Sequence, residues 1–386
     1  IPTSALVIPR QGNIARSAHR SLLGRLWAWL TRQSPLESEP PDSPPARPQR
    51  VEPQSQPTPS RRPQATRKRE DDRPDEPAQF DFEELAAFPR EERVGITVSD
   101  VRALESLIKK VTATIERSHH HLPPFPAVAL EVMSLVHQPD VAINELVRLV
   151  NQDQALTVQL LRVANSAYFS RGEQIKSARQ AIVRLGMRET AMVISASSSY
   201  SLFRVGSRRT AALQSMIDEI WLEGVTNAFG AVWFAMETQK GDPDLVFLAG
   251  MLHDIGKSIA LRALMRLVTN EEETMKSVLP LAPALLEAIH VDAGVGALVT
   301  WNMPTYLVEV CRNHHLPARQ ISDPETHLCR IVSGINRLRT QKLYPVTLET
   351  EVRQSCEHLG ITPNQLRPLA AELRTLAEKS RKMIAK

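Results

Sequence analysis

The chain has 386 residues, of which 42% are hydrophobic and 5% aromatic, enough to bury one large core while terminal regions stay outside it. Its formal net charge of +4 comes from scattered Lys and Arg that are not interleaved with aromatic residues, which argues against a nucleic-acid-binding protein. No apolar run reaches the roughly 18 residues of a membrane span, and no segment resembles a secretory signal, so we expect a cytoplasmic protein. Three cysteines without metal-site spacing predict reduced thiols that pack in the core: Cys311, Cys329 and Cys356.

Residues 1–33 form an N-terminal tail in which residues 13–33 have the pattern of a basic amphipathic helix. Leucines and tryptophans alternate there with arginines, as in Leu26, Trp27, Trp29 and Arg25. Such a helix can lie in a bilayer interface, with tryptophans at the headgroups and arginines facing anionic lipid. We therefore expect peripheral contact with the inner membrane. The alternative is a short helix that docks on the protein itself or on a partner.

Residues 34–80 have the composition of a disordered linker. Twelve of the 28 prolines of the chain fall between Pro35 and Pro77, among Ser, Gln, Arg and Glu. Few apolar side chains are present to offset the entropy of ordering the backbone. We expect an extended spacer.

Helical periodicity resumes in residues 81–121 and continues through the rest of the chain. Residues 101–115 place Val, Leu and Ile on one helical face, and similar patterns follow up to Phe203. No stretch alternates as a half-buried strand would. Asn165 and Ser166 follow an apolar segment and are expected to cap and hydrogen-bond the junction between two helices. The sequence therefore predicts an all-α protein.

His253 and Asp254 stand at the end of the nearly continuous apolar run from Leu245 to Leu252, which predicts a buried helix. A buried polar pair needs partners, and imidazole and carboxylate side by side are suitable ligands for a divalent ion. Gly256 would let the backbone turn close to that ion. In the alternative interpretation, Asp254 caps a helix that starts near Lys257, and His253 is a hydrogen-bonded core residue.

The segment LAGMLHDIGK around this pair resembles the central motif of the HD superfamily of metal-dependent phosphohydrolases and cyclic-nucleotide phosphodiesterases. Upstream, LPPFP, then NQDQALTVQLLRVANSAYF, then AIVRLGM follow one another in an order that resembles the HDOD family, the HD-related output domain of bacterial signalling proteins. The resemblance extends from about Leu122 to Arg339. It implies an all-α, two-lobed module over residues 122–340, followed by C-terminal helices in residues 341–386, with a regulatory role and signalling proteins as partners.

The resemblance also implies a set of HD-type ligand positions, and this chain keeps only part of it. Those that match are His253, Asp254, His314 and His315, with the lysine Lys257 retained after the HD pair. Carboxylates replace imidazoles at Glu223 and Asp292, and a neutral amide, Asn336, replaces the last aspartate. His290, two residues before Asp292, is not assigned to the site.

An incomplete ligand set predicts poor hydrolysis or none, because catalysis needs a firmly held ion that activates water. The remnant is interpreted as a buried polar network or as a weak site for Mn, Fe or Mg, held by His253 and Asp254. We expect a non-catalytic signalling output or scaffold protein. The alternatives are a metal-dependent phosphohydrolase or cyclic-dinucleotide phosphodiesterase, and a sensor that binds a cyclic dinucleotide without cleaving it.

Overall fold

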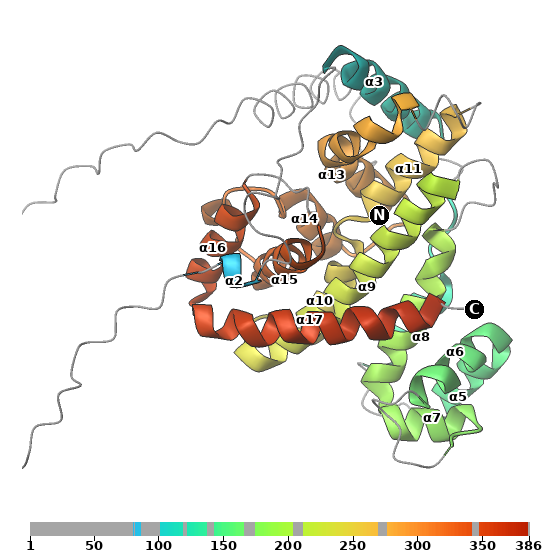
Figure 1. The fold of residues 1–386 in the computed structure, drawn as a ribbon. Helices are drawn as coiled ribbons and strands as arrows, with labels where there is room; N and C mark the ends of the chain where they lie inside the picture. Colours follow the sequence, from blue (N-terminus) through green and yellow to red (C-terminus); the bar gives the residue numbers. More distant parts are fainter. Residues whose placement is uncertain are drawn as a thin grey trace, which may run out of the picture. The chain divides into compact units, whose positions relative to one another are not determined.

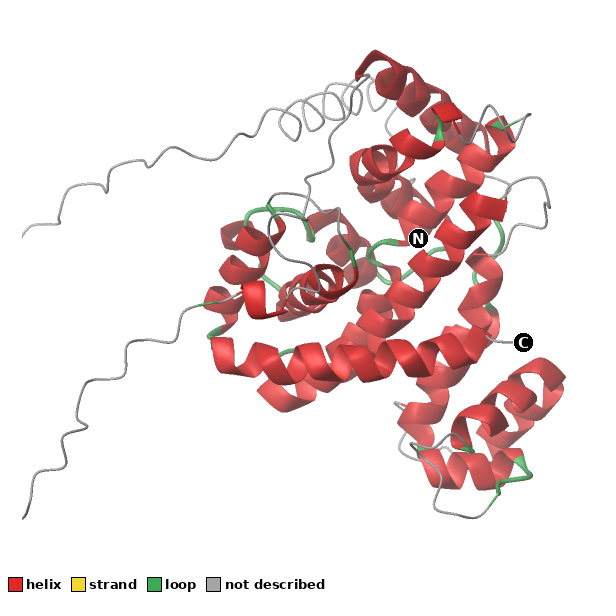
Figure 2. Ribbon diagram, viewed as in Figure 1, coloured by secondary structure: helices red, strands yellow, loops and turns green. Residues whose placement is uncertain are grey.

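The computed structural model describes residues 80, 82–85, 101–118, 122–136, 143–165, 174–203, 211–268, 276–341 and 347–384. They belong to one compact unit, residues 79–386. Every regular element among them is a helix (Figure 2), so the predicted all-α fold is confirmed. The expectations for residues 1–33 and for almost all of residues 34–80 lie outside the described part of the chain.

The first lobe is built from short helices that pack pairwise on one another (Figure 1). They are α4 (Ala127–Val136), α5 (Ile143–Gln152), α6 (Gln154–Ala164), α7 (Ala178–Leu185) and α8 (Met187–Phe203). Polar residues set their ends: the Asp153 carboxylate accepts from the backbone N–H of Ala155 at 2.8 Å, and Ser177 caps α7 in the same way. Gly186, with φ of 90°, ends α7 in a conformation that favours glycine.

Asn165 closes the junction after α6. Its side-chain amide donates to the carbonyl of Ile175 at 2.8 Å, and its side-chain oxygen accepts from the N–H of Ile175 at 2.7 Å. The predicted structural role of Asn165 at a helix junction is therefore confirmed.

The second lobe surrounds the 28-residue helix α9 (Ala211–Thr238). Four of its neighbours, α10, α11, α15 and α17, pack against α9, and α17 crosses it (Figure 1). The remaining elements of the lobe are α10 (Pro243–Leu252), α11 (Ile255–Leu267), η4 (Leu279–Leu281), α13 (Ala282–Thr300), α14 (Thr305–Asn313), η5 (Ala318–Gln320), α15 (Pro324–Thr340), α16 (Leu348–Leu359) and α17 (Pro363–Ile384).

Two elements from the leading segment, residues 81–121, pack on this lobe. Helix α3 (Val101–Ser118) lies against α11 and α13. The short helix α2 (Phe82–Leu85) lies against α15, and the Phe82 side chain is only 4% exposed, with the Arg353 guanidinium 5.7 Å from its ring centre. The folded unit therefore includes residues on both sides of the segment that carries the motifs.

Helices α11 and α13 cross at glycine. A Cβ atom added at Gly256 would lie 1.8 Å from the carbonyl oxygen of His290 and 2.6 Å from the backbone nitrogen of Gly294. Gly256 is thus required for a close helix crossing, where the sequence suggested a tight turn. The three cysteines are buried and free, as predicted.

The stretch Leu279–Thr300 is long and apolar enough to cross a membrane by length and composition, with a mean hydropathy of 1.4 over its best window. This differs from the expectation of no such helix, because the stretch contains polar residues such as Glu287 and His290 that interrupt a strictly apolar run. In this fold, 56% of that window is buried, and the helix packs on α11 and α3. It therefore serves as a core helix of the second lobe.

Candidate metal centre

The site lies where the α10–α11 junction and the end of α14 meet α13. His253 directly follows α10 as its C-cap residue, and Asp254 is the N-cap residue of α11. Asp242 and Pro243 mark the start of α10. His314 follows α14 directly, with His315 next along the chain. Five residues expected from the sequence are brought together here, namely His253, Asp254, Lys257, His314 and His315.

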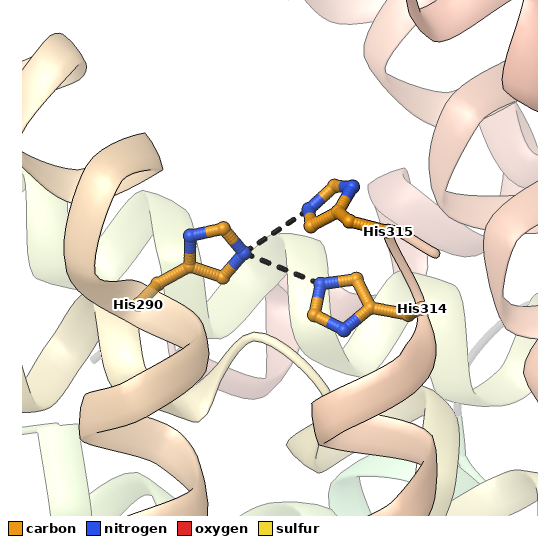
Figure 3. A group of neighbouring side chains, drawn as sticks. All are labelled: His290, His314 and His315. Atoms are coloured by element: carbon orange, nitrogen blue, oxygen red, sulfur yellow. Dashed lines mark hydrogen bonds between the residues drawn. The ribbon is translucent and has the colours of Figure 1, made fainter. Parts of the chain in front are cut away.

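The centre of the site contains a histidine that the sequence did not assign. His290 on α13 points its Nε2 at both His314 and His315, at 3.2 and 3.1 Å respectively (Figure 3). One ligand atom from each of the three histidines lies within 4.8 Å of the other two. His290 and His314 are buried, at 1% and 3% exposure, and the His315 side chain is 34% exposed.

The opposite nitrogen of each ring faces an acceptor. Nδ1 of His290 lies 3.0 Å from the carbonyl oxygen of Leu286, and Nδ1 of His314 lies 2.8 Å from that of Cys311. Nδ1 of His315 lies 3.2 Å from a carboxylate oxygen of Glu351 on α16. A carbonyl or carboxylate can only accept, so each Nδ1 carries the proton and donates it.

In a neutral ring the Nε2 atom then carries a lone pair, and the Nε2 atoms of His290 and His314 face each other at 3.2 Å. Burial lowers the pKa of His290 well below its usual value. Burial together with the neighbouring His315 lowers the pKa of His314 to about 4. Both rings are therefore neutral near pH 7, and no proton lies between their two Nε2 atoms, which are 3.2 Å apart. Converging lone pairs of this kind are stabilised by a cation placed between them.

Asp254 supplies a fourth donor. Its Oδ1 lies 3.4 Å from Nε2 of His290 and 3.6 Å from Nε2 of His314, and it is buried without a hydrogen-bond partner. Burial acts to raise the pKa of Asp254, but Lys257 and the surrounding imidazoles lower it well below its usual range. The carboxylate is therefore ionised, with one oxygen directed toward the imidazole nitrogens.

These donors fit a first-row divalent ion. A tetrahedral ion with bonds of about 2.0 to 2.1 Å holds its donors about 3.3 Å apart. Four donor pairs match that edge: Nε2 of His290 lies 3.2 and 3.1 Å from Nε2 of His314 and His315, and Oδ1 of Asp254 lies 3.4 and 3.6 Å from Nε2 of His290 and His314. Three imidazoles and one carboxylate favour Zn, Fe, Co or Ni over Mg. With His290 counted as a donor, the site offers one more nitrogen than the sequence analysis assigned to it.

The second oxygen of Asp254 belongs to a separate ionic network. Oδ2 accepts from the Lys257 ammonium at 2.7 Å, and that ammonium lies 3.6 Å from Glu287. Glu287 in turn pairs with Arg337 on α15 at 2.6 Å. Burial acts to raise the pKa of Glu287, but Arg337 and Lys257 lower it strongly, so both cations face ionised partners.

The three substituted positions do not join the histidines. Asp292 is exposed on α13. Two residues turn an α-helix by about 200°, so Asp292 and His290 point in nearly opposite directions. Asn336 donates to the side chain of Asn227 at 2.9 Å, and Glu223 accepts from Gln341 at 3.3 Å. The assignment of these three as substitute ligands is replaced by His290 as the further nitrogen donor.

His253 flanks the cluster. Its Nδ1 donates to the carbonyl of Gly250 at 3.0 Å, and its ring meets that of His314 edge to face at 5.3 Å. Asp254 occupies the N-cap position of α11, as in the alternative interpretation, but its side chain makes no capping hydrogen bond. Its carboxylate is used by the cluster and by Lys257 instead.

The sequence analysis did not assign two residues of the site, His290 and Glu351. His290 had a weak local signal, since the small residues Ala293 and Gly294 that follow it mark a close helix crossing. Glu351 had none, because it lies 36 residues from His315 in a separate helix.

Comparison with known proteins agrees with the fold and with the motif order. The HDOD domain family matches residues 122–317. An uncharacterized protein of Treponema pallidum (strain Nichols) is 27% identical over 223 residues, which are 55% of this chain and 41% of that protein. The chain thus spans less than half the length of this relative.

Two solved structures share the fold. One is an HDOD domain protein of unknown function from Geobacter sulfurreducens, with a TM-score of 0.53 and 22% identity, over 72% of this chain and 99% of the other. The second, from Shewanella amazonensis, is named provisionally as a metal-dependent phosphohydrolase. It has a TM-score of 0.54 and 18% identity, over 71% of this chain and 99% of the other.

Proposed function

Because the chain belongs to the HDOD family, we propose that it is a non-catalytic signal-transduction module whose second lobe holds one divalent transition-metal ion. The ion would be held by His290, His314, His315 and Asp254. The observation that carries this proposal is that the Nε2 atoms of His290 and His314 face each other beside an unpartnered, buried oxygen of Asp254, with Nε2 of His315 3.1 Å from that of His290.

A single ion is favoured over a pair. The free oxygen of Asp254 faces the histidines, and its other oxygen accepts from Lys257 at 2.7 Å. A second cation at that oxygen would meet the Lys257 ammonium, which repels it. The Asp254 carboxylate therefore cannot bridge two ions unless Lys257 moves away.

The role we propose for the ion is to fix helices to one another. His290 lies on α13, His314 and His315 follow α14, and Glu351 extends the site to α16. An ion bound to the three histidines would hold α13 against the end of α14, and α16 would be tied to it only through the bond of Glu351 to His315. Ion binding would then alter the surface offered to signalling partners. All four donors are protein atoms, as in closed structural sites, which supports a non-catalytic role.

The test is a calorimetric titration of the chelator-treated full chain with Zn²⁺ and with Mg²⁺. We expect one Zn²⁺ per chain and no measurable Mg²⁺ binding. His290→Ala should weaken Zn²⁺ binding at least about tenfold, since removal of one ligand leaves three. Asp292→Ala, the matched control on the opposite face of α13, should bind Zn²⁺ like the wild type.

Two results would count against this proposal. Equal Zn²⁺ affinity in the wild type and in His290→Ala would remove the metal site. Metal-dependent hydrolysis of a cyclic dinucleotide by the wild type, lost in His290→Ala, would instead establish the phosphodiesterase alternative. Activity should therefore be measured with the same Zn²⁺-loaded and Mn²⁺-loaded samples.

A further inference from the structure

A pocket of about 380 Å³ lies beside the metal centre, on the far side of the Asp254 to Lys257 ion pair. Helices α9 and α13 supply most of its wall, and Lys257 and Arg337 reach it from α11 and α15. It shares none of the three clustered histidines. The pocket and the metal centre are therefore separate sites that share one ionic network.

One end of the pocket is charged. Its two cations already have carboxylate partners, since Lys257 pairs with Asp254 at 2.7 Å and Arg337 pairs with Glu287 at 2.6 Å. Glu223 has no cation within ion-pairing distance in the described part of the chain, and its only hydrogen bond is from the Gln341 amide at 3.3 Å. The other oxygen, Oε1, is buried and has no partner.

This unpartnered oxygen is the feature that needs an explanation. A buried acceptor without a donor destabilises the folded protein, because it has given up its hydrogen bond to water without a replacement. Burial raises the pKa of Glu223, although the charges of Lys257 and Arg337 act to lower it. Because Glu223 lines the pocket, a ligand inside the pocket can supply the missing donor.

The other end of the pocket is apolar. Ile220 lies nearly one turn before Glu223 on α9, and Pro283 and Leu286 face it from α13. Glu219, exposed and four residues before Glu223, adds a second carboxylate to the lining. The walls therefore suit a short hydrocarbon chain, and the charges left without ion pairs are negative.

We propose that this pocket binds a small organic cation, a primary ammonium or guanidinium group carried on a short apolar chain, with Glu223 as its acceptor. An ammonium or guanidinium offers the N–H donors that Oε1 lacks, and its positive charge matches the surplus of carboxylates. An anion would have to compete with Asp254 and Glu287 for Lys257 and Arg337. A metal ion is disfavoured, because only Glu223 is free to bind it at the charged end of the pocket and the nearby Lys257 and Arg337 would repel it.

The experiment uses the full chain, treated with chelator, and four probes with short unbranched alkyl chains: n-butylammonium, n-butylguanidinium, n-butanol and butyrate. Saturable binding, followed by ligand-observed NMR, is expected for the two cations only. Glu223→Gln should weaken cation binding at least tenfold, and Glu219→Gln should weaken it less. Glu237→Gln, an exposed glutamate on the same helix, should have no effect and serves as the matched control.

Zn²⁺ titration of Glu223→Gln shows whether that variant is folded, since the metal centre does not use Glu223. Retained Zn²⁺ binding with lost cation binding supports the proposal, whether or not the wild type has any metal-dependent activity. Butyrate or inorganic phosphate bound as tightly as butylammonium would overturn it. So would equal cation binding by the wild type and Glu223→Gln.

Discussion

His290 and Asp292 show how a shift of two residues decides which side chain reaches the site. Both lie on α13, yet His290 is buried against His314, and Asp292 is exposed. The side-chain direction on a helix advances by about 100° per residue, so residues two apart do not share a face. A ligand assigned from motif position alone can therefore fall on the wrong side of its helix.

Glu351 is expected to act as a positioning residue for the metal. Its carboxylate accepts from Nδ1 of His315 at 3.2 Å and from the Thr347 hydroxyl at 2.7 Å, which fixes the ring and keeps the proton on Nδ1. Loss of such a partner generally weakens metal binding about 10- to 100-fold. We expect Glu351→Gln to weaken Zn²⁺ binding by about tenfold in calorimetry, and Glu357→Gln on the same helix to leave it unchanged. A drop in thermal stability without a change in affinity would assign Glu351 a purely structural role.

Asp254 and Lys257 form a buried ion pair whose two members should be coupled. Removing one partner leaves the other charge buried, which generally destabilises a protein by about 3 to 5 kcal/mol. We expect Asp254→Ala and Lys257→Met each to lower the free energy of unfolding by about that amount in chelator. In the double variant the free energy of unfolding, measured by urea denaturation, should fall by clearly less than the sum of the two single losses. Additive losses would show that the pair does not act as a unit.

At the scale of elements, the site depends on how closely α11 approaches α13. Gly256 and Gly294 face each other across this crossing, and the approach brings Asp254, just before α11, to 3.4 Å from His290 on α13. Neither helix needs glycine for its own conformation, because neither residue has a positive φ. The glycines are therefore required by the packing of two helices that together build the site.

Gly256→Ala tests this crossing. The added Cβ would lie 1.8 Å from the His290 carbonyl oxygen, a backbone atom that can move only with its helix. We expect a loss of at least about 3 kcal/mol in the free energy of unfolding, at the upper end of overpacking effects, together with weakened Zn²⁺ binding. Gly360→Ala is the comparison, since nothing lies within 4 Å of its Cβ position and only a positive φ of 67° opposes it. Similar small losses in both variants would contradict a tight crossing.

His327 joins α15 to α16 and should make stability depend on pH. Its Nε2–H donates to the carbonyl of Ile321 at 3.4 Å, and its Nδ1 accepts from the Ser355 hydroxyl at 3.2 Å. Burial, followed by the stacked ring of His358, lowers the pKa of His327 to about 4. Between that value and the unfolded pKa of about 6.5, the unfolded chain binds the extra proton, so the free energy of unfolding falls as pH falls through this window.

The contribution of His327 to this pH dependence can be isolated with His327→Gln, which cannot titrate. From pH 7.5 to pH 5.0 the wild type should lose about 2 kcal/mol more than the variant, which follows from the difference between folded and unfolded pKa values. Urea denaturation in the presence of chelator measures the free energy of unfolding of the wild type and of the variant at each pH. Parallel losses in the two proteins would mean that His327 does not carry the effect.

At the scale of the whole molecule, the functional unit extends beyond the segment matched by the family. The match ends at residue 317, but α15 contributes Arg337 to the ionic network and α16 contributes Glu351 to His315. Helix α17 packs against α9, the central helix of the second lobe (Figure 1). The helices of residues 341–386 therefore complete the lobe around the site, and a protein truncated after residue 317 would lack part of it.

Residues 13–33 are predicted to bind anionic membranes, which can be tested with the full chain. The tryptophans and arginines of residues 13–33 should draw the full chain to liposomes that contain anionic lipid, and a chain starting at Gln79 should stay in solution. Co-sedimentation measures this, with neutral liposomes as the control for charge. Equal sedimentation of the two chains would remove the membrane interpretation.

By itself, the sequence determined the helical architecture and the neighbourhood of the site. Helical periodicity and the order of the motifs depend on residues close together in the chain, so they could be recognised without coordinates. The same holds for the pair His253 and Asp254 at the end of a buried helix, and for the adjacent His314 and His315.

Tertiary structure alone decided which side chains converge. His290 joins the cluster, and Glu223, Asp292 and Asn336 stand apart from it, because the crossing of α11 and α13 fixes which face of each helix points inward. Glu351 reaches His315 only because α16 folds back beside α15. The direction of a lone pair, and hence the choice between a polar network and a metal centre, depends on partners from distant segments of the chain. No local pattern of residues encodes that direction.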